Sequence, residues 1–229
     1  MSTALEEVKG NAVLFSEMTP PDGGEDVFNA WYDGHHSPSH VQGVPGFISA
    51  MRYRSGIGPH YLAVYELTGP EALDDEEYRK RKLTPDDATR RMLDAVSGFT
   101  RYIANEAFCK ARADSPVMPL DAPVIACVFY TVPMERRGAF ESWYDGEYIP
   151  LLLRCPGWLM ARRFDVLDCD PEPHTHLMLH YLDSEQALRS PEAVQANASE
   201  GWQKFAAEAW FAPVLVAYHR RNDRFLKSG

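Results

Sequence analysis

Three histidines lie close together in an aromatic segment near the start of the chain. The segment reads WYDGHHSPSH over residues 31–40 and contains His35, His36 and His40. An imidazole titrates near neutral pH and can accept or donate a proton, so this residue type suits general acid–base catalysis. His36 is therefore the first candidate for the catalytic acid or base. His35 and His40 are predicted to contact a substrate, and a structural place for His35 at the rim of the core stays open.

The same pattern returns in the second half of the chain without its histidines. The residues that recur are Phe28, Trp31, Tyr32, Asp33, Gly34 and Pro38, repeated as Phe140, Trp143, Tyr144, Asp145, Gly146 and Pro150. A second matching block follows each copy, PGFISAMRY at 45–53 and PGWLMARRF at 156–164. The spacing of the copies far exceeds the roughly 20 to 50 residues of solenoid repeats, which indicates a duplicated domain. We expect one copy to hold the site and the other to support it.

Phenols and aspartates in the two copies are further catalytic candidates. Tyr148 replaces His36 in the second copy, and Tyr148 and Tyr144 are predicted to donate phenolic hydrogen atoms to an anionic intermediate. Asp33 would hold the tautomer of a neighbouring histidine and raise its pKa. Because the aspartate recurs as Asp145, a shared structural role, such as pairing with a strand arginine, is the alternative.

Strand arginines and aromatic rings supply the predicted substrate contacts. Arg52 and Arg54 flank one residue and should point to the same side of a strand. An inward guanidinium would bind a substrate carboxylate through two hydrogen bonds, and a solvated outer face is the alternative. In the second copy Arg163 corresponds to Arg52, and His180 replaces Val64 at a position expected to face the cavity. The remaining predicted contacts are aromatic: Trp31, Tyr32 and Trp143.

Metal binding is a competing interpretation of the histidines. His36 and His40 are four positions apart, and Asp33 or Asp145 would be a third ligand. Pro38 lies between the two histidines, where it removes a helical amide and crowds the preceding turn. The helix is therefore expected to end or kink there, which disturbs the ligand geometry. We predict direct acid–base chemistry with no metal and no cofactor.

Charge and hydropathy exclude several classes of protein. The 229 residues carry 23 Lys and Arg against 33 Asp and Glu, a formal net charge of −10. Such a chain offers no basic stripe to nucleic acid or to an anionic membrane. No apolar stretch reaches the roughly 18 to 20 residues of a membrane span, and residues 1–10 lack a signal-peptide pattern, so we expect a cytoplasmic protein. The four cysteines show no metal-site spacing and are expected to be free thiols.

The order of predicted elements indicates the fold class. In the first copy we expect strands at 12–18, 47–54, 60–67 and 100–110, and helices from residue 25 and over 71–97. In the second copy we expect strands at 124–132, 158–166, 177–182 and 214–220, and helices over 136–154 and 185–210. Each unit has the β-α-β-β-α-β order of a ferredoxin-like domain. The prediction is an α+β protein with domains at 1–111 and 124–229, joined by a linker at 112–123.

The first copy resembles the EthD-like branch of the dimeric α+β barrels. The resemblance rests on the pattern F-x-x-W-Y-x-x-x-H-x-P over residues 28–38, followed by Pro45-Gly46-Phe47 and the strand that contains Arg52. It covers most of the chain as two fused copies. It implies that two ferredoxin-like sheets pair into a barrel with a pocket between sheet and helices. It also places the acid–base histidine of that branch at His36.

Members of this superfamily include lactone isomerases, polyketide cyclases, decarboxylases and monooxygenases. From the resemblance we predict an enzyme, a cofactor-independent lyase that decarboxylates a hydroxylated aromatic acid. His36 would move the proton and Arg52 would orient the carboxylate. Tyr148 or Tyr144 would stabilise a phenolate. A lactone isomerase or cyclase, a coenzyme-free monooxygenase and a binding protein for small aromatic molecules are the alternatives. Haem binding, known in the superfamily, and a homodimer of the fused chain stay open.

Overall fold

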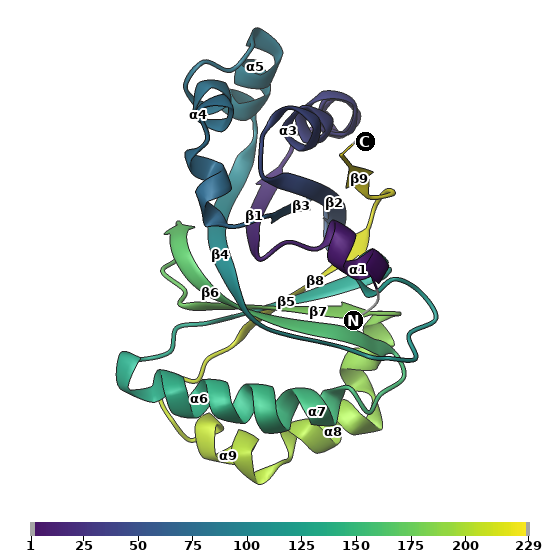
Figure 1. Ribbon diagram of the computed structural model, residues 1–229, viewed down its shortest axis with the longest axis vertical. Coiled ribbons are helices and arrows are strands. Elements are labelled where there is room, and N and C mark those ends of the chain that lie inside the picture. Colours follow the sequence, from purple (N-terminus) through teal and green to yellow (C-terminus); the bar gives the residue numbers. More distant parts are fainter. Residues whose placement is uncertain (1–2, 228–229) are drawn as a thin grey trace.

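An antiparallel β-sheet that closes on itself forms the centre of the molecule (Figure 1). The computed structural model describes residues 3–227. Around the barrel the strand order is β3-β1-β4-β6-β7-β5-β8-β2, and the pairing of β2 with β3 closes the ring. The strands are β1 (Ala12–Thr19), β2 (Phe47–Ser55), β3 (Tyr61–Leu67), β4 (Ser97–Ala111), β5 (Val124–Tyr130), β6 (Trp158–Asp170), β7 (His176–Leu182), β8 (Val214–Arg220) and β9 (Phe225–Leu226).

Helices cover the outside of the barrel on two opposite sides. In Figure 1, α2 to α5 lie above it, α6 to α9 lie below it, and α1 lies beside β2. The α-helices are α1 (Thr3–Val8), α2 (Glu25–Trp31), α3 (Ser37–Gly43), α4 (Glu76–Leu83), α5 (Asp87–Ala95), α6 (Arg137–Trp143), α7 (Ile149–Leu152), α8 (Pro191–Asn197) and α9 (Glu200–Ala206). In the described part of the chain no helix is both long and apolar enough to span a lipid bilayer.

The central strands are apolar on both faces because both faces are covered. Val13 and Phe15 of β1 point into the barrel, where they join the hydrophobic core. Leu14 and Met18 of the same strand pack under the helices of the first half. Strand β5 behaves in the same way, and all of its residues are buried. A strand buried on both faces reads as a continuous apolar run, which is why β1 and β5 lack polar alternation.

The two halves repeat the same topology, so the predicted fold class is confirmed. Each half has the order β-α-β-β-α-β, and the halves join edge to edge through β4–β6 and β8–β2. The first junction is long, from Arg101 opposite Asp170 to Ala111 opposite Met160. The second spans only Tyr53 to Ser55 on β2. Hydrophobic side chains fill the barrel interior between the halves, so the cavity described below lies elsewhere.

Several details differ from the predicted elements. The helix predicted over 71–97 is a 3₁₀ turn at Pro70–Asp74 followed by α4 and α5, and Ser97 already belongs to β4. Helix α1, which packs Leu5 into the barrel core, and the short strand β9 were not predicted. The outermost residues of the two predicted domains, 1–2 and 228–229, lie outside the described residues.

Candidate functional site

A π-helical turn interrupts the first helix at the histidine-rich segment. It spans Tyr32–His36, between α2 and α3, and the amide of Ser37 donates its hydrogen bond to the carbonyl oxygen of Tyr32. Pro38 cannot donate such a bond, and its ring would crowd the carbonyl of Gly34. One extra residue in the turn accommodates the proline without ending the helix. Single-turn π-bulges of this kind are frequent at functional sites.

The π-turn changes which histidines face inward. A regular helical period places His35 near the apolar face, but the structure leaves its side chain 50% exposed. His36 and His40 point inward instead, with ring centroids 4.5 Å apart. The residue inserted by the turn shifts the helical phase, so His35 lies at the exposed rim of the cavity instead of on the apolar face. His35 lies 2.9 Å from the carboxylate of Asp86, which caps α5.

A cavity of about 460 Å³ lies between the sheet of the first half and its helices. Its floor is formed by β1, β3 and β4, one wall by the π-turn and α3, and the other wall by α4 and α5. The side chains on the sheet are Leu14, Ser16, Met18, Tyr65, Phe99 and Arg101, and those from the π-turn and α3 are Tyr32, His35, His36, Ser39 and His40. This volume falls in the range of small-molecule sites in proteins.

His36 presents an unpaired imidazole to this cavity. Its ring packs against Trp31 and Tyr32, with centroid separations of 4.4 and 4.9 Å. Among residues 3–227, neither ring nitrogen of His36 forms a hydrogen bond. Burial, together with the charge of His40, holds the pKa of His36 well below its usual value. His36 is therefore neutral at physiological pH, with one nitrogen to accept a proton and one to donate.

The backbone determines the tautomer of His40. Its Nδ1 atom lies 2.8 Å from the carbonyl oxygen of His36. A carbonyl only accepts, so Nδ1 carries the hydrogen atom and Nε2 keeps its lone pair. Burial lowers the pKa of His40, and the charge of Arg81 lowers it further. A neutral ring with a free Nε2 lone pair is a competent general base.

The predicted strand arginine of the first copy is engaged outside the cavity. Arg52 is completely buried and donates to Asp33 over 2.5 Å and to Asn29 over 3.1 Å. Its guanidinium stacks over Tyr32, 4.1 Å from the ring centroid. Arg54 does point to the same side of β2, where it pairs with Glu25 at the surface. Neither arginine lines the cavity, and Asp33 contacts Arg52 rather than a histidine.

The candidates of the second copy lie in the other half of the molecule. Tyr148 donates to Asn197 over 2.8 Å and stacks on Trp202. Tyr144 lies 2.9 Å from Nε2 of His180, whose Nδ1 accepts a hydrogen bond from Trp158. The region that corresponds to the cavity is packed with aromatic side chains: Trp143, Trp202, Phe205, Trp210 and Phe211. The structure therefore does not bring Tyr144, Tyr148, Trp143 or His180 to His36.

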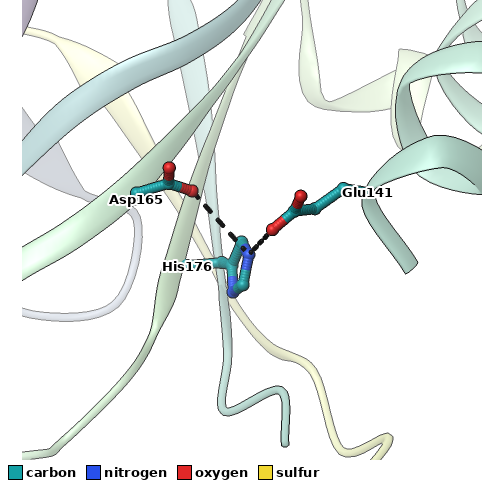
Figure 2. A group of neighbouring side chains, drawn as sticks. All are labelled: Glu141, Asp165 and His176. Carbon is teal, nitrogen blue, oxygen red and sulfur yellow. Dashed lines mark hydrogen bonds and ion pairs between the residues drawn. The ribbon is translucent and has the colours of Figure 1, made fainter. Parts of the chain in front are cut away.

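One cluster in the described part of the chain has the composition of a metal site. Figure 2 shows Glu141, Asp165 and His176 converging, with Nε2 of His176 at 3.1 Å from the glutamate and 3.8 Å from the aspartate. Arg163 already neutralises both carboxylates, at 3.9 and 3.1 Å, and also pairs with Asp145. The arginine supplies the positive charge that a cation would bring, so the cluster is a partly exposed ion-pair network.

The cavity itself can offer a single defined nitrogen ligand to a cofactor. A haem iron needs one neutral imidazole with a free lone pair, and Nε2 of His40 meets that requirement. A structural zinc site needs four ligands. Asp33, the predicted third ligand, is engaged by Arg52, Arg221 and Asn222. His40 would therefore be able to ligate a haem iron, whereas the residues present do not supply the ligands of a zinc site.

Several cavity residues were not predicted from the sequence. Tyr65 comes from β3, and its hydroxyl lies 3.3 Å from that of Ser37. Tyr78 and Arg81 come from α4, and Phe99 from β4. Tyr65 aligns with Tyr181 in the repeat, but Tyr181 lies in the barrel core and Tyr65 faces the helices, so the repeat gives no signal for a cavity position. The contribution of α4 could not have been found either, because nothing in its sequence shows how the helix lies over the sheet.

Comparisons with known proteins identify the fold. No protein-family model matches the chain, and no curated protein matches it. An anthrone oxidase-like protein superposes with a TM-score of 0.65 at 14% identity, covering 95% of this chain and 94% of that one. A proposed monooxygenase from Lactobacillus acidophilus gives 0.62 at 8% identity, covering 95% and 97%. A chlorite dismutase variant from Candidatus Nitrospira defluvii gives 0.57 at 8% identity, covering 95% of each chain.

These structures share the α+β barrel of ferredoxin-like units and correct one prediction. At such low identity they establish the fold, and they do not distinguish the EthD-like branch from others. The decarboxylase prediction was wrong, because the similar proteins are described as monooxygenases and as anthrone oxidase-like. One fold hosts several chemistries, so the activity has to be argued from the cavity.

Proposed function

We propose that this chain is an oxygenase that oxidises a small aromatic carbon acid with molecular oxygen. The observation that carries the proposal is the pair of imidazoles in the cavity. His40 has a free Nε2 lone pair, and His36 has no protein partner for its ring. Two neutral imidazoles side by side can take a proton from one atom of a substrate and return it to another.

The proposed chemistry needs no external reductant. His40 removes a proton from a methylene group between aromatic rings, and the resulting carbanion is delocalised over the ring system. This carbanion reduces oxygen and forms a carbon–oxygen bond. Overall, CH₂ and O₂ give C=O and H₂O, so the four electrons lost by carbon are taken up by the two oxygen atoms. The peroxide takes up the proton that His40 removed. Loss of the second proton from the same carbon then forms the carbonyl group and breaks the oxygen–oxygen bond, and the leaving hydroxide takes up that proton to give water. His36 would relay the proton between these atoms.

The walls of the cavity suit such a substrate. Leu14, Met18 and Phe99 offer apolar surface to a flat ring system, while Tyr65 and Ser39 add hydroxyl groups near the histidines. An apolar wall keeps water away from a carbanion and strengthens electrostatic interactions within the site. The likeness to an anthrone oxidase-like protein supports a substrate of this type, because an anthrone has a methylene group between two aromatic rings.

Oxygen uptake with a dihydroxyanthrone and with its carboxylated derivative tests the proposal. We expect uptake above the protein-free rate, formation of the quinone, and incorporation of labelled oxygen from ¹⁸O₂ into the new carbonyl group. No product should form under nitrogen. His40→Gln should remove the enzymatic rate.

Two control variants keep this test specific. Tyr148→Phe changes the position equivalent to His36 in the filled half, and His219→Gln changes a half-exposed histidine on β8 that does not line the cavity. Both should retain the rate. Turnover under nitrogen would reject an oxygenase, and binding of the substrate without any uptake would support a non-catalytic binding protein instead.

A further inference from the structure

We propose that the substrate of this cavity carries an anionic group, a carboxylate, which is bound by Arg81 of α4. The inference deepens the proposed function and rests on the cavity being the substrate site. Arg81 lines the cavity and lies close enough to His40 for its charge to act on that ring. The carboxylate would therefore sit at the His40 end of the cavity.

Arg81 is a cation without a protein counter-ion. Among the described residues, 3–227, its guanidinium forms no hydrogen bond and no ion pair, and its Nε atom is buried. Two other arginines also have a buried, unpaired Nε, but each has an acidic partner: Arg52 pairs with Asp33 and Arg101 with Asp168. A partly buried charge without a partner is unfavourable. A ligand carboxylate would supply the missing acceptor.

Gly43 leaves space for the guanidinium of Arg81 to pack against α3. A Cβ atom at Gly43 would lie 2.4 Å from an Nη atom of Arg81, so no larger residue fits there without displacing the side chain. The guanidinium consequently packs against the backbone of α3 one turn after His40. This contact restrains a long side chain before the ligand arrives, which lowers the conformational entropy lost on binding.

The charge of the cavity wall also favours an anion, although the chain as a whole has a net charge of −10. Helix α4 contributes Lys80, Arg81 and Lys82 to the wall. Asp86, one of the two acidic residues there, already accepts hydrogen bonds from the amide of Thr89 and lies against His35. Cations therefore remain in excess near His40. A planar guanidinium binds a carboxylate through two parallel hydrogen bonds, which distinguishes this anion from a halide.

Binding of two matched probes tests the inference independently of turnover. The probes are anthracenecarboxylic acid and anthracenecarboxamide, with the substituent at the same ring position. Neither has the methylene group that the proposed oxidation requires. Dissociation constants are measured by fluorescence anisotropy under nitrogen for the wild-type chain and for Arg81→Gln, Arg81→Lys and Arg79→Gln. Arg79 is the control because it lies on the same helix and pairs with Asp74 at the surface.

We expect the wild-type chain to bind the acid about tenfold more tightly than the amide, as charged hydrogen bonds typically allow. Arg81→Gln should lose this preference while its affinity for the amide stays the same, which shows that the cavity is intact. Arg81→Lys should keep part of the preference and Arg79→Gln all of it. Equal affinity of the wild-type chain for both probes would overturn the inference, as would equal losses in Arg81→Gln and Arg79→Gln.

The outcomes separate this inference from the proposed function. Acid preference without oxygen uptake from any anthrone would support anion binding by Arg81 and count against the oxygenase. Oxygen uptake without acid preference would support the oxygenase and count against anion binding by Arg81.

Discussion

Nδ1 of His40 donates a hydrogen bond of 2.8 Å to the carbonyl oxygen of His36, back across the turn that Pro38 distorts. The backbone of one imidazole-bearing residue thus sets the tautomer of the other. The bond leaves Nε2 of His40 as the only atom of that ring able to accept a proton. Pro38 thus affects the turn, the turn affects this hydrogen bond, and the hydrogen bond determines which nitrogen of His40 can accept a proton.

The roles of the two imidazoles lead to a first prediction. His40→Gln should lower kcat for the anthrone by about 10²- to 10⁴-fold, the usual contribution of a general base. His36→Gln should lower kcat as well, while the affinity for the anthracene probes stays within about twofold in both variants. Steady-state kinetics and probe titration measure the two quantities. A raised Kd with unchanged kcat would assign these residues to binding alone.

The pH dependence of the rate gives a second prediction. Burial lowers the pKa of both His36 and His40, so both rings remain neutral below the usual histidine pKa of about 6.5. The acid limb of kcat/KM should therefore lie below pH 6.5, because protonation of the base stops the reaction only there. His219→Gln, which changes a histidine outside the cavity, should leave the limb in place. A limb at or above pH 6.5 would contradict the assignment of a buried imidazole as the base.

The dependence of oxygen uptake on metal ions and haem gives a third prediction. Since the proposed substrate supplies all four electrons, oxygen uptake should survive dialysis against a chelator. Haem added to the chain should not raise the rate, even if Nε2 of His40 ligates it and a Soret band appears. Oxygen uptake and absorbance are recorded on the same sample. A rate that depends on haem would show that the cofactor, and not the substrate carbanion, reacts with oxygen.

Much of this fold could be predicted because the repeat and the apolar strands are local signals. Asp33 and Asp145 recur with strand arginines, and the expected pairs form between Asp33 and Arg52 and between Asp145 and Arg163. What failed was the phase of the first helix. A regular period turns His35 inward, and the extra residue of a π-turn depends on how the whole helix packs.

The candidate site was predicted only in part for a related reason. The histidine segment lies on the cavity wall as expected, and the cavity lies in the half that α4 and α5 cover. In the second half Trp202 and Phe205 fill the equivalent region. A sequence lists aromatic residues without showing whether they line a cavity or fill one. Arg81 was not predicted as a site residue, because it lies in a run of charged residues that is also typical of a solvent-exposed helix.

A fourth prediction concerns the buried ion pair that joins the halves. Arg162 of β6 contacts Glu66 of β3 at 2.6 Å and Glu106 of β4 at 2.5 Å, and its side chain is fully buried. Arg162→Met should lower the free energy of unfolding by about 3–5 kcal/mol, because it leaves the buried carboxylate of Glu66 without a cationic partner, whereas Glu106 keeps Lys9. Arg79→Met breaks an exposed pair and should cost no more than about 1 kcal/mol. Urea denaturation measures both, and similar losses would show that burial is not decisive.

Acid stability provides a last prediction, centred on His180. Burial lowers the pKa of this histidine to about 3, because the ring lies between Trp158 and Tyr144 with both nitrogens in hydrogen bonds. The unfolded chain binds this proton near pH 6.5 and the folded chain does not. The stability contribution is therefore complete above about pH 6.5 and falls as the pH drops toward 3, by up to about 1.4 kcal/mol per pH unit. His180→Phe should reduce the slope of unfolding free energy between pH 6 and pH 4, whatever its effect on stability at pH 7. Tyr148→Phe, which changes a buried ring of the same half that does not titrate in this range, should leave the slope unchanged. Equal slopes in wild type and His180→Phe would mean that this imidazole becomes protonated without unfolding.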